Sequence, residues 1–344
     1  MSDDYRKSYE GQVILVTGGA GAIGTNLTRA LSDANARMVV ILDDLSSGYT
    51  WNIPSRNNIM FVEGCVTDDV CLKRVFFEQP KYVFHLAAFF ANQNSVDYPE
   101  RDLKVNGMGT LRLLEYSHFN KVEKFVYASS GCSIYGSSAP LPLTEEFMSL
   151  NLSSPYQITK MLGELYCNFF RNHYGLKVVK TRFFNSYGPG EVPGQYRNVI
   201  PNFIYWAMKG QVLPITGTGE ETRDFTYVGD LVDGLLRAGY FEAAVGEEFN
   251  LASGRETKII ELANMINEAV GNKAGVKFIQ KRKWDTKSRL LASTKKAKSL
   301  IGYEPGTDFR EGLRNAIKWF KDNWEDIEES ASFAPGVSSA VRDK

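Results

Sequence analysis

Short, almost uninterrupted apolar runs alternate with longer amphipathic segments over the first 185 residues. The apolar runs predict strands at 13–17, 38–43, 59–64, 82–88, 124–130 and 176–184. Because each run is apolar throughout, we expect both faces of each strand to be covered, as in a parallel sheet. The amphipathic segments between them predict helices, for example at 23–34, 100–118 and 155–173. This alternation predicts a doubly wound parallel α/β sheet.

The pattern changes after about residue 185, where two Gly-rich segments, 187–196 and 217–225, are typical of loops. Further helices are predicted at 199–210, 230–243, 257–270 and 309–322. We therefore expect a sheet domain over 1–185, which also receives parts of 225–250, and a smaller C-terminal α/β lobe over 186–326. The composition of residues 327–344 is typical of a disordered end.

Composition and charge exclude several classes of protein. The 344 residues include 40 basic and 40 acidic side chains, so no overall field attracts nucleic acid or an anionic membrane. No apolar stretch approaches the roughly 18 residues of a membrane span, and the first residues lack a signal-peptide core. Cys65, Cys71, Cys132 and Cys167 are scattered and form no CxxC pair, which argues against a disulfide scaffold or a metal site. We expect a soluble protein of the cytoplasm.

The glycine-rich segment TGGAGAIG directly follows the first predicted strand and opens the first predicted helix. Gly18, Gly21 and Gly24 are spaced three apart. Such a turn lets the backbone approach a pyrophosphate, which binds at the N-terminus of the helix. Asp43 ends the second predicted strand, about 20 residues after Gly24, where an acidic residue binds the adenine ribose. Because a carboxylate there repels a 2′-phosphate, we predict NAD as the cofactor, with Asp44 as a second candidate for this contact.

Tyr156 and Lys160 form a YxxxK pair. Pro155 is suited to the first turn of a helix, so the two side chains are expected one turn apart on one face. A free tyrosine titrates near pH 10. A neighbouring ammonium and an oxidised nicotinamide would both favour the phenolate, which could then act as a base. The pair alone is not specific, since many helices contain Tyr and Lys at this spacing.

Motifs at family-like spacing surround this pair: HLAA (85–88), NGMGT (106–110), YASSGCSIYG (127–136), SPYQITK (154–160), RFFNSYGPG (182–190) and TRDFTYV (222–228). With the glycine motif, they resemble the extended short-chain dehydrogenase/reductase family over about residues 11–322, and in particular its NAD-dependent nucleotide-sugar epimerases and dehydratases. The resemblance implies a Rossmann-type domain that binds NAD and a C-terminal lobe that binds a nucleoside-diphosphate sugar. It implies further cofactor contacts from Ala22, Ile23, Ser47, Gly48, Leu86, Ala87, Ala88, Asn106 and Phe183.

The resemblance also implies roles for the YxxxK pair. Tyr156 would deprotonate a sugar hydroxyl while hydride passes to the nicotinamide. Lys160 would lower the pKa of Tyr156 and hold the nicotinamide ribose. In the family's 4-epimerases, the resulting 4-keto sugar turns over and receives hydride on its other face.

The sequence departs from the family pattern beside the predicted active site. Relatives usually carry a Ser or Thr where this chain has Gly131. Some epimerases have a Ser/Thr-Gly-Gly variant, which points to Ser130 as the catalytic hydroxyl, although Ser130 could instead cap the strand end. The next residues, Cys132 and Ser133, replace the acidic side chains of dehydratases and decarboxylases, which argues against those reactions. In GDP-mannose 3,5-epimerases a Cys acts as acid/base in a similar context, so Cys132 is either a second proton-transfer residue or an inert buried thiol.

A second departure lies after the third predicted strand. In GCVTD, Cys65 stands where relatives usually have an Asp that binds the adenine amino group. A thiol is a poor substitute for a carboxylate in this contact. We therefore expect the backbone of Val66 to hold the adenine instead.

The second lobe contributes candidate substrate contacts. By resemblance these are Asn185 in RFFN, Asn198, Val199 and Asn202 in NVIPNF, Arg223 in TRDF, and Arg289 after Trp284-Asp285. The planar guanidinium of arginine suits bidentate binding of a diphosphate.

We therefore predict an NAD-dependent nucleotide-sugar epimerase that acts at C4 through a 4-keto intermediate. The enzymatic alternatives are a nucleotide-sugar C4 dehydrogenase, a 3,5-type epimerase that uses Cys132, and, less favoured, a dehydratase. A catalytically silent NAD-binding scaffold is the alternative from another class. We also expect a homodimer, because family members often pack two helices, here about 97–118 and 153–173, into a four-helix bundle.

Overall fold

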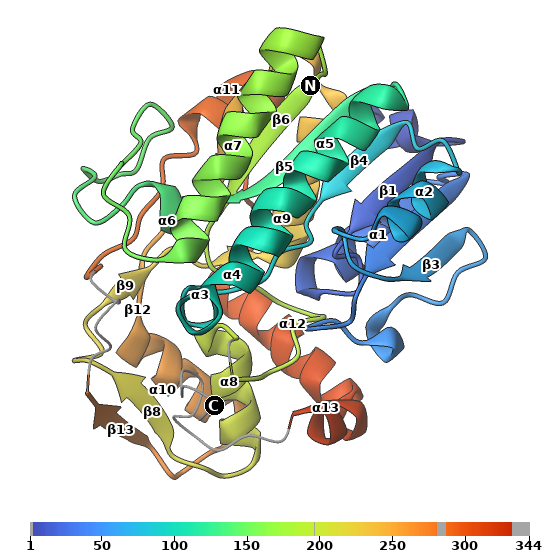
Figure 1. The fold of residues 1–344 in the computed structure, drawn as a ribbon. Helices are drawn as coiled ribbons and strands as arrows, with labels where there is room; N and C mark the ends of the chain where they lie inside the picture. Colours follow the sequence, from blue (N-terminus) through green and yellow to red (C-terminus); the bar gives the residue numbers. More distant parts are fainter. Residues whose placement is uncertain (1–2, 196, 281–286, 332–344) are drawn as a thin grey trace.

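A seven-stranded sheet forms the centre of the computed structural model, which describes residues 3–195, 197–280 and 287–331 (Figure 1). All neighbouring strands in it are parallel, in the order β11-β6-β5-β4-β1-β2-β3. The strands are β1 (Val13–Thr17), β2 (Met38–Asp43), β3 (Ile59–Glu63), β4 (Tyr82–His85), β5 (Lys124–Ser130), β6 (Val178–Phe183) and β11 (Glu248–Leu251). The predicted doubly wound parallel sheet is thus confirmed.

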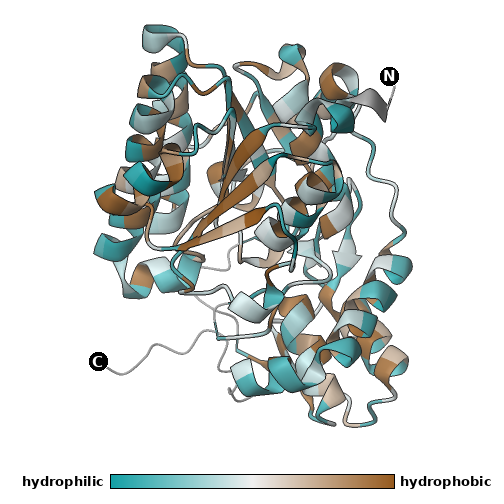
Figure 2. Cartoon of the chain, turned by 90° about the vertical axis from the view of Figure 1, so that its right-hand side faces the viewer, coloured by the Kyte–Doolittle hydropathy of each residue, from teal (hydrophilic) through white to brown (hydrophobic). Residues whose placement is uncertain are grey.

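Helices cover both faces of this sheet, and the apolar strands lie between them (Figure 2). One face packs against α1 (Ala22–Asp33), α9 (Val228–Tyr240) and α11 (Lys295–Ile301). The other face packs against α2 (Asp69–Phe76), α5 (Gly109–Phe119) and α7 (Pro155–Tyr174). Burial on both faces explains why the strands are continuously apolar in sequence. Short 3-10 helices are η1 (Asp3–Tyr9), η2 (Thr50–Asn52) and η4 (Glu242–Ala244).

The helix expected over 100–118 is divided. It consists of α4 (Pro99–Asp102), the π-helix η3 (Leu103–Met108) and α5, and it is preceded by α3 (Asn92–Asp97). A π-helical turn contains an extra residue, so it changes which side chains point inward. Asn106 and Gly107 are the buried residues of this turn.

The second half of the chain both completes the sheet and forms a separate lobe. Strand β11 lies beside β6, and α9 packs against the same face of the sheet as α1 and α11. The lobe is built from α8 (Val199–Met208), α10 (Ile259–Val270), α12 (Phe309–Asp322) and α13 (Trp324–Ser330) around its own apolar core. Three two-stranded pairs accompany them: β7 (Ser186–Tyr187) with β10 (Thr226–Tyr227), β9 (Thr222–Arg223) with β12 (Thr257–Lys258), and β8 (Leu213–Thr216) with β13 (Val276–Ile279).

The C-terminal segment differs from the prediction at its start. Residues 327–330, expected to be disordered, belong to α13, whose Ile327 is fully buried in the core of the lobe. The indole of Trp51 donates a hydrogen bond of 3.2 Å to the Ser330 hydroxyl. The prediction rested on the average composition of the segment, in which the single residue Ile327 has little weight. Residues 332–344 lie outside the described part of the chain.

None of the helices in the described segments combines the length and the apolar character that crossing a bilayer requires.

Candidate active site

A cavity of about 310 Å³ lies at the carboxyl ends of the central strands, beside the first turn of α1. Strand order reverses here, since β1 lies between β2 and β4, and dinucleotides bind at such points in α/β sheets. Most of the predicted cofactor residues line it: Gly18, Gly21, Ala22, Ile23, Gly24, Asp43, Asp44, Ser47, Cys65, Val66, Leu86, Ala87, Ala88, Tyr156, Lys160 and Phe183.

The glycine turn is shaped for close backbone approach. Gly18 has a φ of +71°, and a Cβ there would lie 2.6 Å from the Ala87 nitrogen. A Cβ on Gly24 would lie 2.0 Å from the Gly18 carbonyl oxygen. Gly21 precedes α1 without a side-chain cap, so no side chain occupies the free N–H groups of the first helical turn. This arrangement fits the diphosphate of NAD.

Asp43 has two tasks at the end of β2. Its carboxylate accepts hydrogen bonds from the backbone nitrogens of Ala20 at 3.0 Å and Leu45 at 2.9 Å, and it also faces the cavity. Burial raises the pKa of Asp43, while these two hydrogen bonds oppose the shift. A carboxylate has about four acceptor sites, so two remain for a ribose. Asp44 is exposed and accepts from the Ser46 nitrogen.

Cys65 and Val66 lie on the cavity wall where the adenine was expected. The Cys65 sulfur accepts a 3.1 Å hydrogen bond from the Thr67 hydroxyl, so the thiol is engaged within its own turn. The backbone of Val66 remains the more suitable adenine contact.

Two predicted cofactor residues do not line the cavity. Gly48 packs against Ala20, where a Cβ would lie 2.8 Å from the alanine methyl. Asn106 is buried behind the wall: its amide oxygen accepts from the Phe89 nitrogen at 2.7 Å, and its amide nitrogen donates to Asp102 at 2.8 Å. The inward turn of the π-helix places Asn106 there. Neither residue therefore faces the cavity in this structure.

The predicted catalytic pair, Tyr156 and Lys160, lies in the first turns of α7. This helix begins at Pro155, and the Ser154 hydroxyl caps it by accepting from the Gln157 nitrogen. Tyr156 and Lys160 are both buried and both line the cavity. The Lys160 Nζ donates to the Ala128 carbonyl oxygen at 2.9 Å and lies 5.7 Å from the ring centroid of Tyr156.

Burial dominates the electrostatics of this pair. It raises the pKa of Tyr156, the nearby Asp102 and Cys132 raise it further, and a hydrogen bond with Ser130 lowers it. Burial also lowers the pKa of Lys160 to about 8. The expected depression of the tyrosine pKa is therefore not supplied by the protein alone, and Tyr156 is a neutral phenol at pH 7.

Gly131 is required by the packing beside this pair. A Cβ at Gly131 would lie 2.0 Å from the ring of Phe184, which is fully buried. The family's usual hydroxyl therefore has no room at this position. Ser130 lines the cavity and accepts a 2.9 Å hydrogen bond from the Ser133 hydroxyl. It precedes the short helix α6 (Gly131–Ile134) without capping it, so its hydroxyl is not used by the local backbone.

Cys132 is half-buried on the boundary between the first cavity and a second one. Burial raises the pKa of the Cys132 thiol, while a hydrogen bond from the Asn185 backbone and the charges of Lys287 and Arg223 oppose the shift. The neutral thiol is the stable form at neutral pH.

The second cavity, of about 500 Å³, lies between this boundary and the C-terminal lobe. The predicted substrate residues that line it are Asn185, Asn198, Val199, Asn202 and Arg223. Asn185 and Asn198 line both cavities. Phe90 and Cys132 also line both cavities, so the two cavities are adjacent there. The ring of Phe90 lies 5.9 Å from that of Tyr156, which lines the first cavity.

A comparison with protein families matches residues 14–252 to the NAD-dependent epimerase/dehydratase family. The chain belongs to this family. A UDP-glucose 4-epimerase of Mycolicibacterium smegmatis is 37% identical over 90% of this chain and 98% of its own length. Among solved structures, an epimerase of Methanothermobacter thermautotrophicus is 57% identical with a TM-score of 0.95, covering 96% of this chain and 98% of that one. A Thermotoga maritima UDP-glucose 4-epimerase, solved with UDP-glucose, is 35% identical with a TM-score of 0.85, covering 91% and 99%.

Membership in this family makes NAD the cofactor of the chain, in agreement with the prediction from the glycine turn and Asp43. Within the described ranges, no group of three His, Cys, Asp or Glu side chains is arranged to hold a metal ion.

Arg289 is the substrate candidate that the structure places elsewhere. It lines neither cavity, its side chain is 56% exposed, and its guanidinium is bound to Glu256. The preceding Trp284-Asp285 lies outside the described residues. The lysine two positions earlier, Lys287, lines the second cavity instead and donates to the Cys132 carbonyl oxygen at 2.8 Å.

Sequence reasoning also missed Glu191 and Arg197, which lie in the Gly- and Pro-rich loop before α8 and line the first cavity. Arg197 lines the second cavity as well, and its guanidinium donates to the Ser47 carbonyl oxygen across the cavity mouth. Their only sequence signal was proximity to Asn198.

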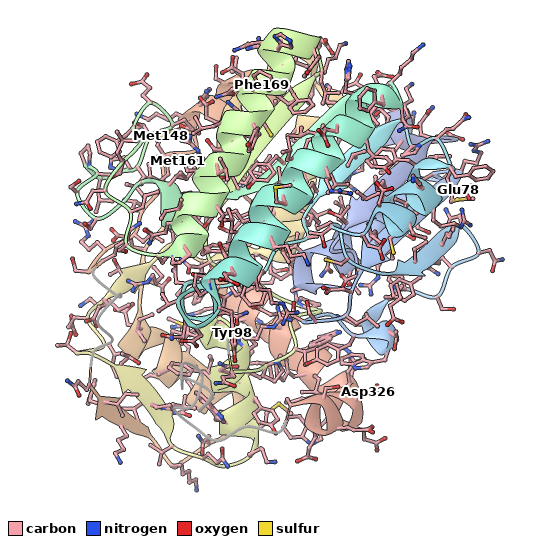
Figure 3. The ribbon with its side chains drawn as sticks, in the orientation of Figure 1. Glu78, Tyr98, Met148, Met161, Phe169 and Asp326 are labelled. Atoms are coloured by element: carbon pink, nitrogen blue, oxygen red, sulfur yellow. The ribbon has the colours of Figure 1, made fainter. Side chains whose placement is uncertain are left out.

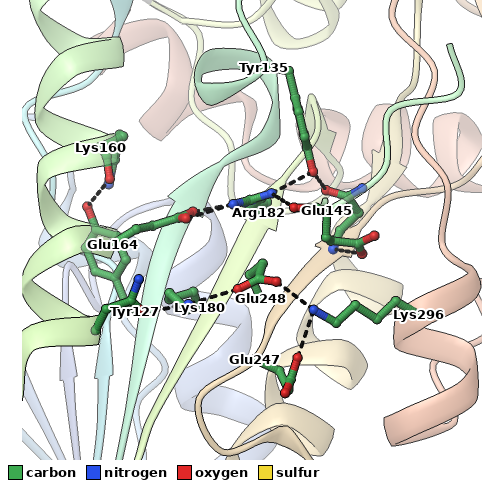
Figure 4. Close-up of polar contacts among 12 residues, drawn as sticks. Tyr127, Tyr135, Glu145, Lys160, Glu164, Lys180, Arg182, Glu247, Glu248 and Lys296 are labelled. Carbon is green, nitrogen blue, oxygen red and sulfur yellow. Dashed lines mark hydrogen bonds and ion pairs between the residues drawn. The ribbon is translucent and has the colours of Figure 1, made fainter. Parts of the chain in front are cut away.

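A buried ion-pair network fixes α7 against the sheet (Figure 4). The Arg182 guanidinium on β6 donates to both carboxylate oxygens of Glu164 on α7, at 3.0 and 2.9 Å. It also donates to the Tyr135 hydroxyl at 3.0 Å and to the Glu145 carbonyl at 3.1 Å. Since Glu164 lies one turn after Lys160, this network sets the position of the catalytic helix. Loss of one partner of such a buried pair strongly destabilises the folded protein, because the other charge remains buried without compensation.

Proposed function

We propose that the chain is an NAD-dependent epimerase that inverts C4 of a UDP-sugar. The carrying observation is that Tyr156, Lys160 and Ser130 line the cofactor cavity, while Phe90, whose ring lies 5.9 Å from that of Tyr156, lines the second cavity as well. The names of the relatives support the substrate class, since a UDP-glucose 4-epimerase and a UDP-N-acetylglucosamine 4-epimerase are among them.

The residues of the first cavity perform the proton transfers in this proposal. When bound, NAD supplies reversible hydride exchange at the nicotinamide. The positive charge of bound NAD⁺ would favour the phenolate of Tyr156. This phenolate would take the proton from the sugar hydroxyl, which Ser130 also hydrogen-bonds, and would later return it. Lys160, held by the Ala128 carbonyl, places its positive charge beside the tyrosine and the ribose. Because Tyr156, Lys160 and Ser130 are buried, their surroundings exclude water from the oxidised sugar.

The second cavity holds the rest of the substrate in this proposal. Arg223 and the amides of Asn198 and Asn202 bind the diphosphate, because charged and amide donors match phosphate oxygens. Asn185, which lines both cavities, contacts the substrate between its diphosphate and the reacting sugar.

Elimination and decarboxylation are disfavoured by the residues after Gly131. Cys132 and Ser133 provide no carboxylic acid, and the Ser133 hydroxyl is already bound to Ser130. This distinguishes the chain chemically from dehydratases, although a UDP-glucuronic acid decarboxylase of Xenopus tropicalis is 30% identical to it. A 3,5-type epimerisation that uses Cys132 is the second candidate, because the thiol reaches the boundary of both cavities.

One experiment separates these reactions. The purified protein is incubated with UDP-, GDP-, dTDP- and CDP-sugars, and products are identified by NMR while absorbance is followed at 340 nm. We expect C4 inversion of a UDP-sugar without net NADH. Net NADH would indicate a dehydrogenase, deuterium uptake from D₂O at C3 or C5 would indicate the thiol-dependent reaction, and either result overturns the proposal.

A matched pair of variants tests the base. Tyr156→Phe is expected to lower turnover by about three orders of magnitude while NAD remains bound. Tyr166→Phe, on the same helix but outside both cavities, should retain normal turnover. A silent scaffold would show no turnover in the parent protein.

We further propose a homodimer formed by η3, α5 and α7. Large apolar side chains are exposed on these helices, among them Leu103, Met108, Ile158, Leu165 and Phe169. Figure 3 shows Phe169 on the outer helix α7. Several large apolar side chains exposed on neighbouring helices are typical of an interaction surface. Leu165→Glu should yield monomers in light scattering, whereas Phe278→Glu, an exposed apolar site on the other lobe, should not; dimers in both variants would contradict this.

We also propose a cytoplasmic location. The four cysteines are free thiols. Unpaired cysteines are typical of proteins kept in a reducing compartment.

A further inference from the structure

Glu191 is a buried acid that the proposed reaction does not use. It lies between β7 and α8, it lines the cofactor cavity, and it is only 4% exposed. Its Oε1 accepts a 2.9 Å hydrogen bond from the Asn198 amide. Its Oε2 is buried and has no hydrogen-bond partner among the described residues. A buried oxygen without a partner is unfavourable, so Glu191 gains a hydrogen bond if its carboxyl turns toward a ligand in the cavity that the residue lines.

The loop that carries Glu191 is fastened to the cofactor domain. The amide of Asn26, on α1, donates to the Pro189 carbonyl at 2.8 Å. The amide of Asn52, on η2, donates to the Gly190 carbonyl at 2.8 Å. Gly190 has a φ of +92°, and a Cβ there would lie 3.2 Å from the Ala22 carbonyl oxygen. These contacts hold Glu191 beside the first turn of α1, where the dinucleotide diphosphate binds.

The surroundings of Glu191 favour its neutral form. Burial raises the pKa of Glu191 to about 7, while the charge of Arg197 and the hydrogen bonds from Asn198 oppose the shift. The segments that hold the loop contribute the uncharged Asn26 and Asn52. The other charged or titratable groups of the cavity are Asp43, Asp44, Cys65, Arg101, Cys132, Tyr156 and Lys160.

We propose that Glu191 binds the NAD diphosphate as a neutral carboxylic acid, with its Oε2–H donating to a phosphate oxygen. Oε1 keeps its bond from Asn198, so the proton resides on Oε2. An ionised carboxylate at this place would repel the diphosphate, because both would be anions in a buried site. Binding of NAD therefore holds the proton on Glu191. The affinity for NAD is measured without a sugar, so a failure of this proposal is distinguishable from a failure of the proposed substrate.

Linkage gives the sign of the effect. Free Glu191 loses its proton as the pH rises through about 7, whereas bound Glu191 must keep it. The affinity for NAD is therefore constant at low pH and falls as the pH rises above this value. The expected slope approaches about tenfold in Kd per pH unit.

The test measures the Kd of NAD⁺ for the cofactor-free full-length chain by calorimetry, from pH 6 to pH 9 at constant ionic strength. Glu191→Gln keeps a neutral N–H donor, so at pH 6 its Kd should lie within about threefold of the parent value, and its steep rise above pH 7 should be lost. Lys160 also titrates near pH 8. Its contribution is present in both proteins, and the difference between the two profiles isolates Glu191.

Two controls complete the experiment. Glu146→Gln, at an exposed site outside both cavities, should keep the parent profile. In buffers of different ionisation enthalpy at pH 8, the parent protein should take up about one proton more than Glu191→Gln as NAD⁺ binds, because any proton released by Tyr156 or Lys160 is common to both proteins. Equal pH profiles for the parent and Glu191→Gln, an affinity that rises with pH, or equal proton uptake by these two proteins would each overturn the proposal.

Discussion

Introducing a side chain at Gly131 tests whether the catalytic hydroxyl has moved to Ser130. Gly131→Ser restores the hydroxyl that relatives usually carry, so a reading from family pattern alone predicts a faster enzyme. In this chain the new Cβ would lie 2.0, 2.2 and 2.7 Å from three atoms of the Phe184 ring. All three distances are far shorter than a normal contact.

The cost of this overlap follows from the packing around Phe184. The ring is fully buried and lies 6.3 Å from the ring of Tyr135, with the two rings nearly parallel. Tyr135 is fixed in turn by Asn250 and Arg182. Since the ring cannot retreat, overpacking should cost about 3 kcal/mol of unfolding free energy, which corresponds to roughly 5 °C in Tm.

Chemical denaturation and turnover are measured together. We expect Gly131→Ser to be destabilised and slower, whereas Gly306→Ser, where a Cβ meets nothing within 4 Å, should match the parent protein. Adding Phe184→Leu to Gly131→Ser should recover part of the lost stability, giving a favourable coupling of about 1 kcal/mol or more. A Gly131→Ser variant with parental stability and raised turnover would refute the reasoning.

Three further results are expected. Ser130→Ala should lower kcat by about 100-fold, whereas Cys132→Ala should change it less than about threefold, and the reverse order would assign the proton transfer to the thiol. Arg223→Ala should raise the KM of the nucleotide sugar by about tenfold or more, whereas Arg289→Ala, which removes only an exposed pair, should leave it unchanged. Burial lowers the pKa of Lys160 to about 8, so between about pH 8 and 10.5 the unfolded chain binds more protons than the folded one. The contribution of Lys160 to the free energy of unfolding therefore rises with pH in this range. Denaturation curves of Lys160→Met should lack this rise, and an unchanged rise would contradict the assignment.

The strands were predictable because local composition and burial coincide in a parallel sheet. The predicted bounds of β1, β2 and β5 match the structure. Strand β4 instead ends at His85, although its apolar run continues to residue 88. Leu86, Ala87 and Ala88 are apolar because they line the cofactor cavity, not because they extend the strand. A run of apolar letters cannot distinguish these two reasons.

The candidate site was predictable where a motif is short in sequence. Tyr156 and Lys160 are one helical turn apart, and the glycine turn lies within one strand–helix junction, so spacing alone brings these groups together. Arg289 was misjudged because its partner, Glu256, is 33 positions away in the chain. Glu191 was missed because its burial depends on α1 and η2, which precede it by well over a hundred residues.

The raised pKa of Tyr156 bears on how one residue can serve both halves of an epimerisation. In the proposed reaction, Tyr156 accepts a proton when the sugar alcohol is oxidised and returns it when the ketone is reduced. Burial and Asp102 favour the neutral phenol, so the protein by itself prepares the acid. The positive charge of bound NAD⁺ would favour the phenolate, whereas the neutral ring of NADH would not. The basicity of Tyr156 is therefore highest when a base is needed and declines when an acid is needed, which requires no movement of the side chain.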